Sequence, residues 1–388
     1  MTNSTDIRPF QIDIPQAELD ELRDRLAATR WPVLPAAAES DWGRGIPTGY
    51  LKGLAEYWGS AFDWRKQEAR MNAYPQFVTE IDGQPIHFFH VRSPEPDAMP
   101  LLITHGYPSS VVEFLDLLGP LSDPRAYGGD PADAFHVVVP SVPGFGFSTP
   151  LTSTGWEVGR TSDAFAQLMA RLGYEKFAAQ GGDIGAGVTG RLGGLLPERV
   201  IGTHVNSDQG SLGLAGEQFP IPDGLSEDEL AVIEAARARW AEMKGYLVLQ
   251  STQPNSIGPA LTDSPVAQLA WIAEKYQDWT DPARTAEESV DRDLLLTTIS
   301  LYWFTRSGAS AAQFLYEATH SGIDWVAPSN VPQGWAVFNS HPVLRKIMDP
   351  DHRIGHFSEY ASGGHFAAME EPKLFLDDVR TFFRKLRG

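Results

Sequence analysis

The chain has 388 residues, a formal net charge of −19 at pH 7 and no cysteine. The negative charge argues against nucleic acid or an anionic membrane surface as a partner, and the lack of cysteine excludes disulfides and thiolate metal sites. Hydrophobic residues make up 42% and charged residues 21%, as in ordinary globular proteins. No signal-peptide pattern and no run of about 18 apolar residues occurs. We therefore expect a soluble, cytoplasmic protein.

The N-terminal part is expected to be helical. Residues 15–31 place leucines on one helical face and charges on the other, and residues 50–58 predict a second helix with an aromatic face. From Gln76 the apolar period changes to two, and Asp82-Gly83 separates two alternating runs, which predicts a β-hairpin. We expect the sheet to start there.

The pattern then alternates between strands and helices. A short apolar strand ends at His105-Gly106, a buried strand covers 135–140 and runs into the glycine loop Gly144–Ser148, and further strands surround Phe177 and Val200. This alternation indicates βαβ units and a mostly parallel sheet with helices on both faces.

The alternation stops after Asp208. Residues 209–330 are helical in pattern and rich in tryptophan and tyrosine, as expected of a helical lid inserted between core strands. A strand at 334–338, another near Phe357 and a C-terminal helix from Pro372 complete the core. The predicted segments are 1–75, a core in two parts at 76–208 and 331–388, and the lid at 209–330.

One stretch, FAAQGGDIGAGVTGR at 177–191, predicts a strand, a tight turn and a helix with a reactive side chain at the apex. This is the pattern of the nucleophile elbow in an α/β-hydrolase, and here the apical residue is Asp183. A histidine that acts as base follows the last strand in this fold, and His365 in the GGHF loop fits that place.

An aspartate nucleophile determines the reaction class. A carboxylate that attacks a carbonyl would only make an anhydride, whereas attack on an sp³ carbon gives an ester that water can cleave. Epoxides and alkyl halides both qualify as substrates. Halide would need N–H donors, but Ile184 follows the nucleophile and its side chain cannot donate, and the lid is rich in tyrosine. These residues favour an epoxide.

Motifs along nearly the whole chain resemble the epoxide hydrolases of the α/β-hydrolase fold, specifically the microsomal-type branch with an N-terminal meander. They are RPFQIDIP, HGYP, GFGFS, GGDIG, TDSP, VPQGWAVF and GGHFAAMEEP. The resemblance implies that residues 1–75 form the meander, without the membrane anchor that some members carry.

The resemblance also implies roles for individual residues. Asp183 matches the nucleophile and His365 the base that activates water, while Tyr246 and Tyr316 match two lid tyrosines that hold and protonate the epoxide oxygen. The backbone N–H groups of Tyr107 and Ile184 match the oxyanion hole.

The sequence departs from the family where a carboxylate would orient the histidine, because the matching position holds His341. We expect Asp208, just after the strand that follows the elbow helix, to take this part, with Asp349 and Glu359 as further candidates.

The resulting hypothesis is an epoxide hydrolase that converts an apolar, bulky epoxide, aromatic ones included, to a vicinal diol through an ester on Asp183. Its partners would be the epoxide and water, no metal or organic cofactor is needed, and the sequence leaves its assembly into a homo-oligomer open. Relatives of this type serve in detoxification or natural-product pathways. Two alternatives are a binding protein that has lost catalysis with the triad acid and, behind it, a haloalkane dehalogenase.

Overall fold

The computed structural model describes residues 6–35, 41–323 and 329–387. Its centre is a sheet whose described strands follow the order β1-β2-β3-β5-β4-β6-β7-β8-β9. The strands are β1 (Arg8–Phe10), β2 (Gln76–Ile81), β3 (Gln84–Val91), β4 (Met99–Thr104), β5 (Phe135–Pro140), β6 (Phe177–Gly182), β7 (Val200–Asp208), β8 (Gln333–Phe338) and β9 (His356–Glu359). The first three strands pair antiparallel, β3 pairs antiparallel with β5, and all pairs from β5 to β9 are parallel. This confirms the predicted α/β-hydrolase sheet.

One prediction about the sheet is wrong, because the sheet does not start at Gln76. Residues Arg8–Phe10 pair with β2 and form the edge strand. Three residues are too few to show a period of two, so the sequence did not reveal this strand.

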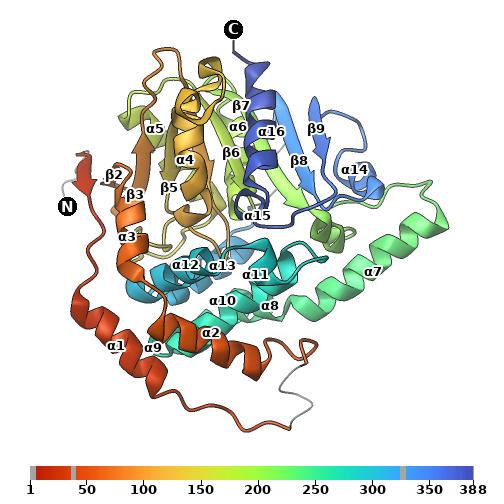
Figure 1. Cartoon of the computed structure of the whole chain (residues 1–388). Helices are drawn as coiled ribbons and strands as arrows, with labels where there is room; N and C mark the ends of the chain where they lie inside the picture. Colours follow the sequence, from red (N-terminus) through yellow and green to blue (C-terminus); the bar gives the residue numbers. More distant parts are fainter. Residues whose placement is uncertain (1–5, 36–40, 324–328, 388) are drawn as a thin grey trace.

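Two helix pairs flank the sheet (Figure 1): α4 (Leu115–Ser122) packs with α16 (Pro372–Arg384), and α5 (Val158–Arg171) packs with α6 (Ile184–Leu195). In Figure 1 the first pair lies in front of the strands. The short helices of the core are η2 (Val111–Phe114), η3 (Pro124–Tyr127), η4 (Pro131–Asp133), η5 (Gln209–Leu214), α14 (Pro342–Met348) and α15 (Ala367–Glu370).

Between β7 and β8 the chain leaves the sheet and forms a helical layer across the edge at which the parallel strands end (Figure 1). Its helices are α7 (Glu227–Met243), α8 (Gly245–Thr252), α9 (Pro254–Asp263), α10 (Pro265–Trp279), α11 (Ala286–Ser289), α12 (Arg292–Thr305) and α13 (Ser307–His320). This is the segment predicted as a lid, of which residues 324–328 lie outside the described part.

The N-terminal segment wraps this helical layer. It contains α1 (Gln16–Ala27), α2 (Thr48–Ser60) and α3 (Trp64–Asn72), of which α3 was not predicted; residues 1–5 and 36–40 lie outside the described part. Helix α2 packs on α10, and the indole N–H of Trp58 donates to the Ser300 hydroxyl of α12 at 2.9 Å. The N-terminal segment therefore stabilises the position of the helical layer over the ends of the strands.

Candidate active site

Asp183 lies at the carboxyl end of β6, on the sharp turn into α6. Its φ of +53° falls in the left-handed region, which costs free energy in a residue other than glycine and is typical of functional turns. The neighbouring glycines allow the turn to be this tight. A Cβ on Gly185 would lie 1.9 Å from the Thr104 carbonyl oxygen, and one on Gly106 would lie 2.4 Å from the Asp183 Cβ.

The Asp183 carboxylate has two different oxygen environments. Oδ1 accepts a hydrogen bond from the backbone N–H of Tyr107 at 2.8 Å, and Ile184, the first residue of α6, contributes one of the N–H groups that a helix start leaves without an intrahelical partner. Oδ2 lies 3.9 Å from Nε2 of His365. One carboxylate oxygen therefore faces the expected oxyanion hole and the other faces the expected base.

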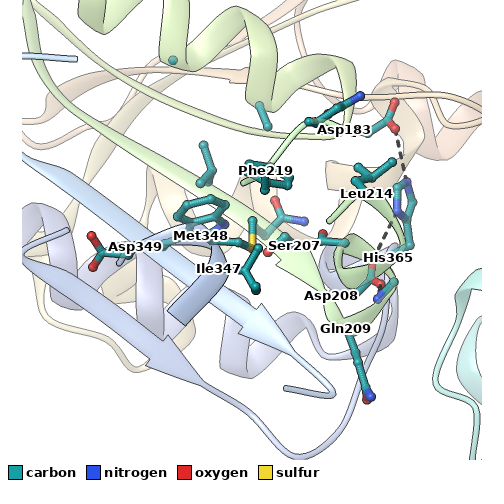
Figure 2. Close-up of a pocket in the computed structure, with 18 of the residues that line it drawn as sticks. Asp183, Ser207, Asp208, Gln209, Leu214, Phe219, Ile347, Met348, Asp349 and His365 are labelled. Atoms are coloured by element: carbon teal, nitrogen blue, oxygen red, sulfur yellow. Dashed lines mark hydrogen bonds and ion pairs between the residues drawn. The ribbon is translucent and has the colours of Figure 1, made fainter. Parts of the chain in front are cut away.

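His365 is on the loop between β9 and α15, and its ring lies between two carboxylates (Figure 2). Its Nε2 faces Asp183, while its Nδ1 lies 3.4 Å from Oδ2 of Asp208. Asp208 is the last residue of β7, and its other oxygen accepts a hydrogen bond from the Gly210 N–H at 2.5 Å, which fixes the carboxylate. The three residues come from the carboxyl ends of β6 and β7 and from the loop after β9, which the parallel sheet brings to one edge.

The structure places the other carboxylate candidates away from His365. Asp349 accepts the N–H groups of Arg353 and Ile354 and so holds its own turn together. Glu359 is exposed and accepts from the Ser340 hydroxyl. His341, at the family's usual acid position, caps α14 by accepting the Val343 N–H. Of the three carboxylates proposed to orient the histidine, Asp208, Asp349 and Glu359, only Asp208 lies beside the imidazole.

The surrounding charges control the protonation of His365. Burial lowers the pKa of the imidazole. The hydrogen bond to Asp208 and the negative charges of Asp183, Asp208 and Glu113 together raise it by more than burial lowers it, and the result is a pKa of about 9. A pKa of about 9 makes His365 an imidazolium at neutral pH. Loss of the Asp183 charge would remove one of the causes of the raised pKa.

Hydrogen bonds to Glu370 and Asp281 hold the His365 loop against the helical layer. The two oxygens of Glu370 accept the N–H groups of Phe366, at 3.0 Å, and Asp281, at 2.8 Å. Asp281 in turn accepts the Gly363 N–H at 3.1 Å, and the His365 N–H donates to the carbonyl of Trp279 at 2.8 Å. Burial raises the pKa of Glu370 to about 8, although both hydrogen bonds lower it. The sequence does not predict this set of hydrogen bonds, referred to below as the clamp, although Glu370 belongs to the GGHFAAMEEP motif.

The structure brings one of the two predicted lid tyrosines to Asp183. The ring of Tyr246, on α8, stacks on Tyr107 with centroids 5.9 Å apart and contacts Trp279 edge-on at 5.1 Å. Burial, followed by the charges of Asp183 and Tyr107, raises the pKa of the Tyr246 hydroxyl well above its usual value. The hydroxyl thus stays protonated and can donate.

Tyr316 lies elsewhere on α13. Its ring stacks on His320 with centroids 4.1 Å apart, and the residues of α13 that line the cavity at Asp183 are Leu315 and Thr319. Adjacent residues on a helix point about 100° apart, so the neighbour of a lining residue can face away from the cavity. The role expected for Tyr316 stays a prediction that this geometry does not support.

A cavity of about 1590 Å³ opens at Asp183, Asp208, Tyr246 and His365, and its lining extends along β7 and β8 as far as the end of α16. Figure 2 shows Leu214 and Phe219 beside the catalytic candidates and Ile347 and Met348 farther along it. Trp240, Leu247, Trp279 and Trp335 also line it. A large, mainly apolar cavity with a few polar groups at one point suits an apolar ligand.

The glycine loop Gly144–Ser148 is held together by its own hydrogen bonds and has a structural role. The Gly144 N–H donates to the Ser148 carbonyl at 3.0 Å, and the Ser148 hydroxyl donates to the Ser141 carbonyl at 2.8 Å. The loop is therefore a closed turn next to β5.

Comparison with known proteins agrees with this geometry. Residues 7–114 match the family described as the epoxide hydrolase N terminus, and residues 99–205 match the alpha/beta hydrolase fold. The chain is 34% identical over 402 residues to epoxide hydrolase 1 of Sus scrofa, covering 97% of this chain and 88% of the relative. A protein of Stigmatella aurantiaca with a provisional epoxide hydrolase name is 43% identical over 385 residues, covering 98% and 86%.

The solved structure of Aspergillus niger epoxide hydrolase superposes with a TM-score of 0.82 at 32% identity, covering 98% of this chain and 97% of the other. The fold is that of the alpha/beta hydrolases, and Asp183 lies on the turn between β6 and α6. The chain belongs to the epoxide hydrolase family. Within the described residues, no helix is long and apolar enough to cross a membrane.

Proposed function

We propose that the chain hydrolyses an apolar epoxide in two covalent steps, with Asp183 as nucleophile, Tyr246 as acid and His365 as base. The observation that supports this most directly is the line of contacts from Asp183 Oδ2 through the two ring nitrogens of His365 to Asp208. The tyrosine comes from the helical segment 209–330, which would act as the lid of the site.

In the first step, Oδ2 of Asp183 attacks an epoxide carbon and the bond from that carbon to the ring oxygen breaks. The oxygen takes the proton of the Tyr246 hydroxyl, so the products are a hydroxyalkyl ester on Asp183 and a tyrosinate. Esterification removes the Asp183 charge, which lowers the pKa of His365 from its free-enzyme value of about 9. The proton that His365 then loses restores the Tyr246 hydroxyl.

In the second step, neutral His365 accepts a proton from water, and the hydroxide attacks the ester carbon. Oδ1 becomes the oxyanion at the place where the Tyr107 N–H already donates, and the helix-start N–H of Ile184 can join it. When the intermediate collapses, the leaving alkoxide takes the proton of the attacking hydroxyl. The diol is released, Asp183 is a carboxylate again and His365 is again an imidazolium stabilised by Asp208.

We further propose that the substrate is a bulky epoxide of apolar, including aromatic, structure. This proposal rests on the tryptophan and aliphatic lining of the cavity. A carboxylate beside His365 also removes the main reason for regarding the chain as a binding protein that has lost its triad acid.

Trapping the ester tests this function. The variant His365→Gln, mixed with styrene oxide and related epoxides, should gain the mass of one epoxide on the peptide that contains Asp183. Asp183→Asn should gain none and should form no diol. The proposal fails if the wild-type protein forms diol while His365→Gln carries no adduct, or if the adduct lies on another residue.

A further inference from the structure

A buried lysine lies next to the proposed acid. Lys275, on α10, is 3% exposed, and its Nζ lies over the ring of Tyr246, 5.0 Å from the centroid. Lysine is almost never fully buried without a reason, because removing an ammonium from water costs free energy. The mechanism above gives this cation no part.

Two side chains of α10, those of Lys275 and Trp279, contact the ring of Tyr246. Trp271, Lys275 and Trp279 are spaced by four residues and so share one helical face. Nζ of Lys275 also lies 6.0 Å from the Trp271 ring, and the Trp279 ring contacts both Tyr246 and His365. The ammonium is therefore set among the aromatic rings that surround the proposed acid.

Lys275 forms an ion pair with Glu274, and its charge also acts on Asp278, one helical turn further along α10. Glu274 accepts a hydrogen bond from Nζ at 2.5 Å, and the Glu274 side chain is 26% exposed, so water partly screens this carboxylate. Lys275 itself is buried, and electrostatic interactions are stronger in the protein interior than in water.

Tyr246 needs such a cation for the reaction. Asp183 and Tyr107 raise the pKa of its hydroxyl, after burial, and so both disfavour negative charge on the phenol oxygen. When Tyr246 gives its proton to the epoxide oxygen, negative charge develops on its ring and oxygen. A cation over the ring stabilises that charge more than it stabilises the neutral phenol. Tyr316, the second tyrosine expected to share this charge, is not among the residues of α13 that line the cavity.

We propose that Lys275 is a positioning residue that acts through Tyr246, by stabilising the negative charge on this tyrosine while the epoxide ring opens. The inference rests on the proposed function and identifies the groups that make its acid effective. Lys275 acts through the ring of Tyr246 and does not touch the substrate.

Rapid-quench measurement of the two steps tests the proposal. Lys275→Met should slow formation of the Asp183 ester by about tenfold or more and leave hydrolysis of the ester within about twofold, because only the first step places charge on Tyr246. Lys275→Arg, which keeps the cation, should recover most of the rate of ester formation. Equal slowing of both steps would overturn the proposal.

Two controls separate charge from structure. Glu274→Gln breaks the same ion pair but leaves the ammonium, so ester formation should not slow; a loss equal to that of Lys275→Met would show a structural role instead. In a double-mutant cycle, Lys275→Met should have little further effect in a Tyr246→Phe background, whereas additive losses would contradict action through the hydroxyl. If the wild-type protein forms no ester at all, the proposed function fails and not this inference.

Discussion

Asp208 Oδ2 lies 3.4 Å from His365 Nδ1, and the same carboxylate is fixed by the Gly210 N–H. The contact joins the end of β7 to the loop after β9. Asp208, the carboxylate proposed to orient His365, therefore comes from a strand in the middle of the parallel sheet. His341, at the position where the family usually has the acid, serves as a helix cap instead. The structure thus favours orientation of the imidazole by a carboxylate at the end of β7, and not by a residue after β8.

The first prediction concerns this carboxylate. Asp208→Asn should slow hydrolysis of the ester by between about 10²- and 10⁴-fold, because the imidazolium loses its counter-charge and the ring its orientation. Asp349→Asn is the matched control, because Asp349 is also a carboxylate that accepts backbone N–H groups but holds only its own turn. Single-turnover decay of the ester measures both variants, and similar losses in the two would exclude Asp208 as the acid.

The second prediction compares the two tyrosines of the helical layer. Tyr246→Phe should slow ester formation by about 10²-fold or more, since the epoxide oxygen loses its proton donor. Tyr316→Phe should leave the rate within about threefold, because the ring of Tyr316 stacks on His320 and Tyr316 is not among the residues that line the cavity. Rates of epoxide consumption under single-turnover conditions decide this, and equal losses would restore the role that the sequence predicts for Tyr316.

The third prediction concerns the pKa of His365. Asp183→Asn mimics the uncharged ester, so it should lower the pKa of the imidazole from about 9. NMR titration of the His365 ring in the wild-type protein and in this variant measures the shift. An unchanged pKa would contradict the idea that esterification converts His365 to a base.

The same raised pKa affects stability. Because the folded-state pKa of His365 lies above the unfolded value, its contribution is fully present below about pH 6.5 and is lost as the pH rises through about 9. The free energy of unfolding of the wild-type protein, relative to His365→Gln, should therefore fall between these pH values. Chemical denaturation across this range measures it, and a flat or rising difference would show that the charges around His365 have been misassigned.

The fourth prediction concerns the clamp on the His365 loop. Glu370→Gln keeps the shape but has one acceptor oxygen for two N–H donors, so the loop should shift and ester hydrolysis should slow by about 10- to 10²-fold. Glu371→Gln, next in the chain, loses only a partly exposed ion pair with Arg284 and should have little effect. Both variants need a thermal-unfolding control; if their rates match, Glu370 does not position His365.

Much of the fold and part of the site could be predicted because their signals are local. The elbow at Asp183 needs small residues beside it, and the order of nucleophile and histidine follows from the chain direction in this fold. Features that depend on tertiary distance could not be predicted. Whether Asp208 or Asp349 meets His365 is decided by where two loops lie in space. Which of Leu315 and Tyr316 faces the cavity depends on the rotation of α13 about its axis.

Buried charges were the hardest features to predict. In the sequence, Lys275 and Glu370 resemble ordinary surface residues of helices, because nothing local shows that an aromatic ring or two backbone N–H groups will cover them. The burial of Lys275 and Glu370 depends on how α10 and the loop after β9 pack in the folded chain.

The measurement that tests the covalent mechanism most directly is a single turnover in ¹⁸O-labelled water, with excess enzyme over epoxide. If Asp183 supplies the oxygen to the substrate and water then attacks the ester carbon, the first diol contains unlabelled oxygen and the peptide with Asp183 gains one ¹⁸O. Label in the diol after this first turnover, with none in Asp183, would mean that water attacks the epoxide directly and would contradict the account.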